Sequence, residues 1–463
     1  MEALPPFETF ADLNHQPHIS LKQNGSVETY AIGSQPFRLK LEHSYYQKHR
    51  QIVRASVLDQ WLGVLGGRAL FSGGALQDVH VRLGQDADGN VYWDLGDPGW
   101  KLLKISPDGW SVVTECPVKF RRPAGYLELP VPVAGGSVDE LRPFLNVADD
   151  DQFRLIVGWL VASLNPHGPY PILELTGQQG TAKSTAARFL RLLIDPNASP
   201  ARSMISNERD LAIAADNGWM LAFDNVSKLS DAMSDALCRM STGGAFSARK
   251  LYSDSEEKLF QYKRPVILNG ITDLATRPDL LERVVSVELQ RISSRARKPE
   301  LELEQAFFLA RPKILGALAT AVSAALGNRN SLPVLEWPRL ADASKWVTGA
   351  EPALGWAMGT FNQLLHESKG RSGERVLEEN EPLVKALRAL AEVGWTGTAS
   401  ELLSALDPEC IVRLPKGPNG LSGTLRRLSP VLADYGLVVD FRRTGSGGTR
   451  LIELSVKVYA KAA

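Results

Sequence analysis

The centre of the chain alternates short apolar runs with helical hydrophobic patterns. Residues 153–164 (FRLIVGWLVASL) are nearly all apolar and predict a buried helix, and residues 185–194 (TAARFLRLLI) gather alanine, phenylalanine and leucine on one helical face. Four apolar runs around them predict strands: YPILELTG (170–177), NGWMLAFDNVS (217–227), RPVILNGI (264–271) and LLERVVSVELQRI (280–292). Strands that alternate with helices are typical of a parallel α/β sheet, which we place in a core of residues 139–300.

The first 138 residues follow a different pattern. ETYAIGSQPFRLKLEHSYY has strand-like residues, and IVRASVLDQWLGVLGG predicts a helix that stops at Gly66-Gly67. Alternating residues flank two Asp-Gly turns, at 88–89 and 108–109, and predict hairpins. RPAGYLELPVPV predicts two proline-spaced strands, and Ser137, with Glu140 three residues later, predicts a helix cap. We expect a β-rich accessory domain over 1–138, in which Asp94 and Asp97 are structural turn residues.

Beyond residue 300 the pattern becomes helical. Residues 301–378 predict a helical region. Residues 379–463 predict three helices followed by the strands LVVDFRR and TRLIELSV, an order typical of a winged-helix domain.

Composition narrows the class of protein. The 463 residues are 44% hydrophobic and 22% charged, as in soluble globular proteins, and the formal net charge is 0. Cys116, Cys238 and Cys410 lie too far apart for a disulfide framework or a zinc site, which fits a reducing cytosol. We see neither a signal peptide nor an apolar run of about 18 residues. The expectation is a cytoplasmic protein without a membrane partner.

A phosphate-binding motif lies between the first predicted strand and its helix. The pattern G-x-x-x-x-G-K-[ST] is met by Gly177, Lys183 and Ser184, with Ala182 in place of the second glycine. Backbone N–H groups of such a loop surround phosphates, the lysine reaches β and γ oxygens, and the hydroxyl binds Mg²⁺. We predict ATP and Mg²⁺ as ligands, with the ATP contacts made by Gly177, Gln178, Gln179, Gly180, Thr181, Ala182, Lys183, Ser184 and Thr185.

Ala182 is the departure within this loop. A positive φ would strain alanine by about 1–2 kcal/mol. We expect a helix-like conformation one residue before the lysine, where alanine is tolerated.

Two polar strand ends complete the predicted catalytic site. Asp224 follows the second strand and would hold Mg²⁺. Asn269 ends the third strand, where its amide can orient the attacking water. Asn225 stands where many such ATPases have a glutamate base, so the general base stays open, with Glu174 as one candidate. Arg283, or the nearby Arg277, would stabilise transition-state charge on the γ-phosphate in a neighbouring subunit.

The order of these motifs resembles the superfamily three helicase-type AAA+ ATPases of phages and mobile elements. GQQGTAKST, AFDNVS, KRPVILNG and RPDLLERVVSVELQ carry the likeness, which is greatest to the helicase part of poxvirus- and phage-type primase-helicases. The resemblance implies a hexameric ring acting on single-stranded or forked DNA, with a replication partner such as a primase. It also makes residues 247–258 a DNA-contacting pore hairpin, with Arg249, Lys250, Tyr252 and Lys258 as contacts, although SDSEEK at its tip is acidic.

A second candidate DNA surface lies at the C-terminus. Residues 411–450 hold seven basic and two acidic side chains. A recognition helix and a wing would present Arg426, Arg427, Arg442, Arg443 and Arg450 to DNA. A solvated face used for protein contacts is the alternative.

We therefore predict an ATP-dependent, ring-forming DNA helicase or translocase that acts in the replication of a phage or mobile element. The alternative is an ATP-switched DNA-binding or helicase-loading protein with weak hydrolysis. Asn225 and the acidic hairpin tip favour that alternative.

Overall fold

A computed structural model of the chain describes residues 4–23, 25–249, 257–271, 274–275, 277–293, 295, 297–406, 415, 417–444 and 449–456. Within these ranges the side chains of 245–249, 257–261, 370–376, 378–379, 427, 430 and 434 are not described. The fold is mixed α/β and divides into two compact units. The first comprises Met1–Ala275 and Glu282–Leu364, and the second comprises Thr276–Leu281 and Leu365–Ala463.

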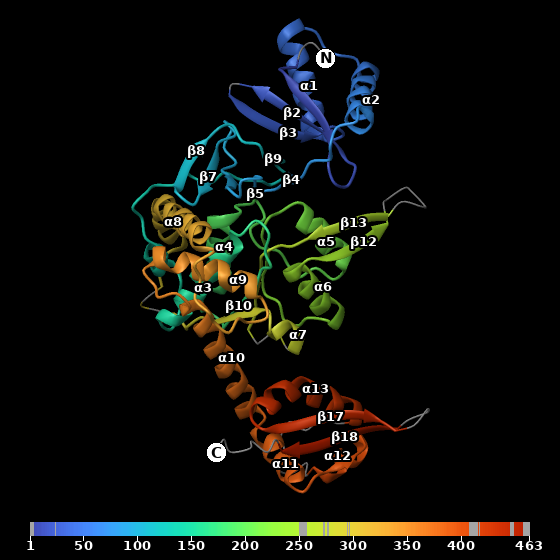
Figure 1. Cartoon of the computed structure of the whole chain (residues 1–463), viewed down its shortest axis with the longest axis vertical. Coiled ribbons are helices and arrows are strands. Elements are labelled where there is room, and N and C mark those ends of the chain that lie inside the picture. Colours follow the sequence, from blue (N-terminus) through green and yellow to red (C-terminus); the bar gives the residue numbers. More distant parts are fainter. Residues whose placement is uncertain are drawn as a thin grey trace. The chain divides into compact units, whose positions relative to one another are not determined.

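A four-stranded parallel sheet forms the centre of the first unit (Figure 1). The strand order is β11-β14-β10-β15, and all three pairings are parallel. These are the predicted strands: β10 (Ile172–Thr176), β11 (Leu221–Phe223), β14 (Val266–Asn269) and β15 (Val284–Glu288). The predicted parallel α/β sheet is thus confirmed, and its carboxyl edge is where the ends of β10, β11 and β14 meet.

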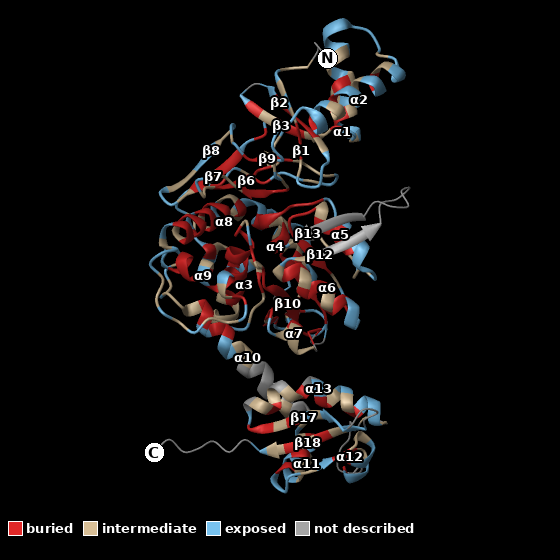
Figure 2. Cartoon of the chain, turned by 45° about the vertical axis from the view of Figure 1, so that its right-hand side comes forward, coloured by how far each residue is buried: buried red, intermediate tan, exposed pale blue. Residues whose placement is uncertain are grey.

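Buried helices cover this sheet, as the red interior of Figure 2 shows. α3 (Asp150–Ser163) is the predicted apolar helix, and every residue from Leu155 to Ser163 is buried. α4 (Lys183–Ile194) packs through Phe189, whose ring stacks on Phe307 at 4.3 Å. The other helices here are α5 (Glu208–Asp216), α6 (Asp231–Thr242), α8 (Glu300–Asn328), α9 (Ala341–Ala350) and the 3-10 helices η1 (Val138–Phe144) and η3 (Glu351–Leu354). The apolar positions of these helices and strands are therefore buried around the central sheet.

Among the described helices, α8 alone is long and apolar enough to cross a membrane. More than half of its apolar window is buried inside the protein. Ile314, Leu318 and Val322 are among its fully buried residues. Its apolar character is explained by this packing.

The first 138 residues combine three small sheets with two helices. One sheet has the order β1-β2-β3, one is the meander β5-β6-β7-β8 with both predicted hairpins, and one pairs β4 with β9. The elements are β1 (Phe7–Ala11), β2 (Pro17–Gln23), β3 (Ser26–Ala31), α1 (Gln35–His49), α2 (Ala55–Phe71), β4 (Val79–His80), β5 (Leu83–Gln85), β6 (Val91–Asp94), β7 (Leu102–Ser106), β8 (Gly109–Val113) and β9 (Lys119–Phe120).

Three local predictions for this region were wrong. The segment FRLKLEHSYY is helical because Ser34 caps α1 by accepting the N–H of Phe37. α2 continues past Gly66-Gly67 to Phe71, since Leu65 and Ala69 on the same face are buried. Residues 122–133 form no strand, because their prolines have no N–H to donate to a sheet. Ser137 does form the predicted capping box with Glu140, on a 3-10 helix.

The second unit contains the elements predicted at the C-terminus in the predicted order. α11 (Glu381–Glu392), α12 (Ala399–Ala405) and α13 (Pro418–Asp434) precede the antiparallel pair β17 (Leu437–Arg443) and β18 (Arg450–Val456), and β16 (Thr396–Gly397) completes a three-stranded sheet. Leucines from all three helices form its core. α7 (Pro278–Leu281) and most of α10 (Thr360–Glu379) also belong to this unit.

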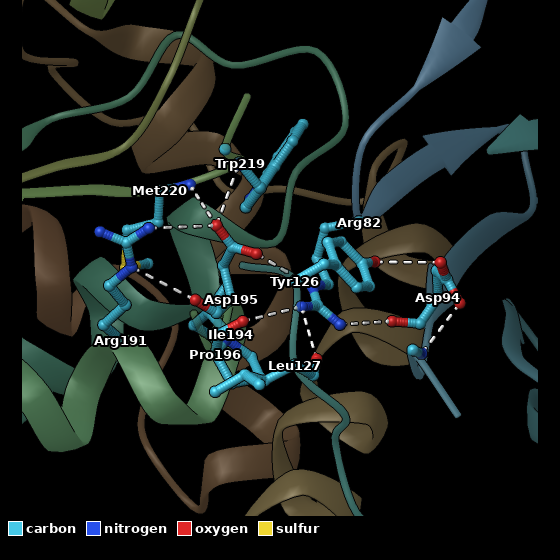
Figure 3. A network of polar contacts seen from close by, with 12 residues as sticks. Arg82, Asp94, Tyr126, Leu127, Arg191, Ile194, Asp195, Pro196, Trp219 and Met220 are labelled. Atoms are coloured by element: carbon cyan, nitrogen blue, oxygen red, sulfur yellow. Dashed lines mark hydrogen bonds and ion pairs between the residues drawn. The ribbon is translucent and has the colours of Figure 1, made fainter. Parts of the chain in front are cut away.

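A buried polar network joins the β5–β8 sheet to the central sheet (Figure 3). Arg82 is fully buried, and its Nε donates to Asp195 Oδ1 at 3.0 Å. Asp195 Oδ2 accepts the backbone N–H groups of Trp219 and Met220 at 3.0 and 3.1 Å, directly before β11. The Arg82 guanidinium also stacks 3.5 Å from the ring centroid of Tyr126. Asp195 therefore connects the end of α4, the start of β11 and the β5–β8 sheet.

The neighbouring carboxylate of Asp94 has the structural role expected for it. It is fully buried and accepts hydrogen bonds from Arg122, from the Tyr126 hydroxyl and from the Gly96 N–H. Asp97 accepts turn N–H groups from Gly99 and Lys101.

Removing Arg82 should destabilise the first unit strongly. Arg82→Ala leaves the buried Asp195 carboxylate without its closest cation, and breaking a buried pair in this way costs about 3–5 kcal/mol. The free energy of unfolding of the first unit, from urea titration, measures this loss. Arg38→Ala is the matched control, because Arg38 pairs with exposed Asp59 and should contribute less than about 1 kcal/mol. Equal losses in the two variants would contradict the structural role of the network.

Candidate functional site

The predicted phosphate loop connects β10 to α4 at the carboxyl edge of the sheet. Gly177 has φ 138° and Gly180 has φ 84°, backbone conformations that favour glycine. A Cβ atom on Gly177 would lie 2.6 Å from the carbonyl oxygen of Leu289, so this position also has no room for a side chain. The N-terminal N–H groups of α4 follow at once and have no capping side chain. The loop is thus a turn with glycine at two positive-φ positions that ends at a helix N-terminus, which is a favourable place for an anion.

Ala182 is in the left-handed conformation, with φ 61° and ψ 31°. The expectation of a helix-like backbone at this position was wrong. The chain must reverse its course between the loop and α4, and the residue that ends such a turn commonly takes a positive φ. Alanine in this region is strained by about 1–2 kcal/mol relative to a right-handed conformation. The loop therefore keeps the backbone path that a glycine would give, at a cost in stability.

The Lys183 side chain makes hydrogen bonds to the backbone of the phosphate loop. Its Nζ donates to the carbonyl oxygens of Gly177 at 2.6 Å and Gln178 at 2.9 Å. Thr181 donates its hydroxyl to the same Gln178 carbonyl at 3.0 Å. Burial lowers the pKa of Lys183, while the negative charge of Asp224 acts in the opposite direction. The ammonium thus lies over the centre of the loop. Gln178 and Gln179 are exposed, and Thr185 is half-buried in the first turn of α4.

Asp224 and Ser184 are adjacent across the carboxyl edge. The Ser184 hydroxyl donates to Asp224 Oδ1 at 2.7 Å, although forty positions separate the two residues. No group of three or more His, Cys, Asp or Glu side chains able to hold a metal occurs among the described residues. A hydroxyl and one carboxylate nevertheless fit Mg²⁺, which prefers few protein oxygens together with water and substrate phosphates.

Asn269 lies between these groups at the end of β14. Its Oδ1 accepts the backbone N–H of Asn225 at 2.7 Å, which fixes the orientation of the amide. The side chain is 1% exposed, and its Nδ2 has no hydrogen-bond partner in the described structure. A buried donor left unsatisfied is costly and indicates a missing acceptor.

Asn225 is exposed and left-handed, with φ 53°. Asparagine is enriched several-fold among non-glycine residues in this region of backbone space, which gives a local reason for asparagine rather than glutamate.

Glu174 does not lie at the strand end. It is the third residue of β10, is 1% exposed, and accepts the N–H groups of Leu274 at 2.6 Å and Ala275 at 3.0 Å. The Ser286 hydroxyl of β15 donates to its other oxygen. These contacts give Glu174 a structural role, fastening the segment after β14 to the sheet, and argue against its use as the general base.

The two candidate arginines are placed differently. Arg283 directly precedes β15, and the register pairs Val284 with Ile172 at the start of β10. Strands rise about 3.3 Å per residue, so Arg283 lies on the amino edge, roughly 20 Å along the strand direction from the loop that begins at Gly177. It is only 8% exposed. Arg277 belongs to the second unit. The structure does not bring Arg283 into the phosphate site of its own chain.

The predicted DNA-contacting segment forms a hairpin of β12 (Gly244–Arg249) and β13 (Glu257–Tyr262). The Tyr262 hydroxyl fastens its base by donating to Asp216 at 2.7 Å. Lys250 and Tyr252 lie outside the described residues, as do the side chains of Arg249 and Lys258. Their DNA contacts stay a prediction.

In the second unit the basic residues gather at one end of the β17–β18 hairpin. Arg443 and Arg450 are direct cross-strand partners, and both are exposed. Arg442 pairs with Glu453 at 3.0 Å, and the Arg426 guanidinium lies 4.0 Å from the ring centroid of Phe441. The side chain of Arg427 is not described. Like charges directly opposite one another destabilise a hairpin.

One basic feature of the site was missed by sequence reasoning. Arg291, Arg295, Arg297 and Lys298 belong to the segment after β15, in which Ile292 donates its N–H to Gly180 of the phosphate loop and the Arg297 guanidinium lies near Gly180. Four cations within eight positions and no acidic residue among them were a visible signal. Their nearness to the loop could not be read from the sequence.

Replacing Ala182 tests the left-handed conformation directly. In a helix-like backbone, Ala182→Gly would lower the free energy of unfolding by up to about 1 kcal/mol. With φ at 61°, relief of strain should leave stability unchanged or raise it by up to about 1 kcal/mol. Ala182→Val should lower it, because β-branched residues tolerate positive φ poorly. Thermal unfolding of the three proteins measures the order, and a clear loss for glycine would contradict the conformation described.

Comparisons with known proteins identify the family. A family model described as "Actinomycete integrative conjugative element replication protein" matches residues 138–353, and a model of the "AICE RepA C-terminal domain" matches residues 383–462. Together they span well over half of the chain. A search of curated proteins gave no match.

Solved structures show only distant likeness. The apo structure of the NrS-1 C-terminal region in its A form is 12% identical, with 97% of each chain covered and a TM-score of 0.42. A crystal structure of JCV helicase bound to a small molecule is 14% identical over 46% of this chain and 64% of that chain, with a TM-score of 0.25. The family matches carry the identification: the chain belongs to the replication proteins of actinomycete integrative conjugative elements.

Proposed function

We propose that the protein is an ATP-dependent DNA helicase or translocase that acts in replication of its mobile element. The observation that carries this proposal is the hydrogen bond between Ser184 and Asp224, next to the phosphate loop that Lys183 contacts. A hydroxyl, a carboxylate and an ammonium at the mouth of one helix N-terminus suit a nucleoside triphosphate with Mg²⁺.

Each group of the site has a chemical task in this proposal. The backbone N–H groups of the loop and Lys183 bind the phosphates. Ser184 and Asp224 would hold Mg²⁺, which neutralises charge on the β- and γ-phosphates. The unsatisfied Nδ2 of Asn269 donates to the γ-phosphate or to the attacking water. Preorganised donors of this kind stabilise developing charge because they need no reorganisation during the reaction.

The position of Arg283 favours assembly. Because Arg283 lies on the edge of the sheet opposite the phosphate loop, it can serve a nucleotide only in another subunit. A closed ring gives every subunit such a neighbour. We therefore propose a homo-oligomeric ring, hexameric by resemblance to the superfamily three helicases, with Arg283 as the arginine that acts between subunits.

DNA would be bound at two places. The β12–β13 hairpin is the proposed contact within the ring, and the C-terminal unit, as a winged helix, is the second. Arg443 and Arg450 support the second contact, since they are exposed side by side and neither forms an ion pair with a described residue. Phosphate contacts of this kind position DNA without reading its sequence.

One observation favours a second candidate function. Position 225 holds an exposed asparagine rather than a carboxylate, and Glu174 is occupied by structural hydrogen bonds. An ATP-switched DNA-binding or helicase-loading protein needs nucleotide binding but little hydrolysis. Strand displacement on a forked duplex separates the two candidates: ATP binding with neither turnover nor unwinding would reject the motor.

Substitutions in the loop should separate nucleotide binding from hydrolysis. Lys183→Ala should weaken Mg-ATP binding roughly 100-fold, because it removes the cation that contacts the terminal phosphates. Asp224→Asn should bind ATP comparably but lower the hydrolysis rate by roughly 100-fold or more. Calorimetry and phosphate release measure the two effects. Unchanged ATP binding by Lys183→Ala would refute both candidate functions.

Substitutions in the hairpin test the C-terminal DNA contact. Arg443→Ala with Arg450→Ala should weaken binding to every DNA sequence alike and lower the slope of log affinity against log salt by about one per lost phosphate contact. Fluorescence anisotropy at several salt concentrations measures both. Lys385→Ala, which removes an exposed cation paired with Glu381 on α11, is the control and should change neither. Unchanged DNA affinity in the double variant would assign this surface to protein contacts.

A further inference from the structure

A basic segment runs beside the phosphate loop. We call residues 289–293, 295 and 297–299, between β15 and α8, the basic strap. Leu289 donates its backbone N–H to Thr176 O at 2.9 Å, and Ile292 donates to Gly180 O at 3.3 Å. The strap therefore continues the pairing of β15 with β10 beyond the sheet and along the loop itself.

The far end of the strap is fastened to the helix that follows the loop. Arg188 of α4 pairs with Glu300 at 2.9 Å and also with Glu304, at the start of α8. Both ends of the strap are thus tied to the strand, loop and helix that form the phosphate site. This arrangement limits how far the strap can move from the loop.

The strap carries positive charge that no acidic residue of the strap balances. Its charged residues are all basic, namely Arg291, Arg295, Arg297 and Lys298. All four are exposed, and none makes an ion pair with another residue of the described structure. Cations clustered beside an anion-binding loop raise the local positive potential and attract a polyanion.

Arg297 is the residue of the strap that reaches the loop. Its Nη2 lies 3.3 Å from where a Cβ atom of Gly180 would stand. Gly180 is exposed in the middle of the loop, at φ 84°. The guanidinium is therefore at the mouth of the loop, where phosphates enter.

We infer that Arg297 binds the phosphates of the nucleotide held by residues 177–184 of its own chain. This inference rests on the proposed ATP binding. A guanidinium presents several N–H donors in a planar fork that matches phosphate oxygens. Arg283 lies on the opposite edge of the sheet. Within one subunit, the phosphate site is therefore served by Arg297.

The test uses the full chain and a non-hydrolysable Mg-ATP analogue. Arg297→Ala should bind the analogue about tenfold or more weakly, as expected for loss of a charge-assisted hydrogen bond. Arg297→Lys should fall between it and the wild type, because it keeps the charge but not the fork. Lys298→Ala is the matched control, an exposed neighbouring cation, and should stay within about twofold of the wild type. Calorimetry gives the affinities, at a protein concentration where sedimentation shows single chains.

Several outcomes would overturn the inference. One is binding by Arg297→Ala within about twofold of the wild type, while Lys183→Ala loses binding. Another is equal weakening by Arg297→Ala and Lys298→Ala, which would mean a diffuse field instead of a contact. A defect seen only in assembled protein would place the contact between subunits. If the wild type itself does not bind the analogue, the proposed function fails, and the inference fails with it.

Discussion

The parallel pairing of β10 with β14 on one side and β15 on the other decides where every group of the candidate site lies. Parallel strands end at one edge, so the loop after β10, Asp224 after β11 and Asn269 at the end of β14 meet there. The same pairing sends Arg283 to the opposite edge and brings the strap after β15 alongside the loop. One set of backbone hydrogen bonds thus places the loop, Asp224 and Asn269 at one edge of the sheet and Arg283 at the other.

Two residues of the site have a left-handed backbone conformation, which one of them tolerates better than the other. Both departures from the expected sequence pattern, Ala182 and Asn225, fall at positive φ. At Ala182 the conformation is strained, and the loop keeps its course because β10 and α4 hold both of its ends. At Asn225 the conformation suits the residue, and the backbone N–H is used to orient Asn269. A carboxylate at 225 would have to adopt the same left-handed backbone to act as a base.

A buried ion pair connects the β5–β8 sheet to the core that holds the candidate site. Asp195 receives Arg82 from the β5–β8 sheet and two backbone N–H groups that precede β11. Asp224 directly follows β11, so the polar network and the carboxylate proposed to hold Mg²⁺ lie at the two ends of one short strand. The region predicted to be an accessory domain therefore contacts the start of the strand that precedes Asp224. A buried ion pair of this kind is costly to break.

The sequence by itself determined the parallel sheet, its four strands and the loop, because apolar runs, glycine spacing and polar strand ends are local signals. It also indicated that Asp224 and Asn269 would lie near Lys183, since strand ends of a parallel sheet converge. It did not determine α1, the length of α2 or the absence of strands in residues 122–133, where capping, burial and missing proline N–H groups outweighed local propensity. Only the tertiary structure decided that Ala182 is left-handed, that Glu174 accepts structural hydrogen bonds and that Arg297 lies at the loop. Those facts depend on hydrogen bonds and contacts between residues far apart in the chain, and no local pattern records which partner a side chain will meet.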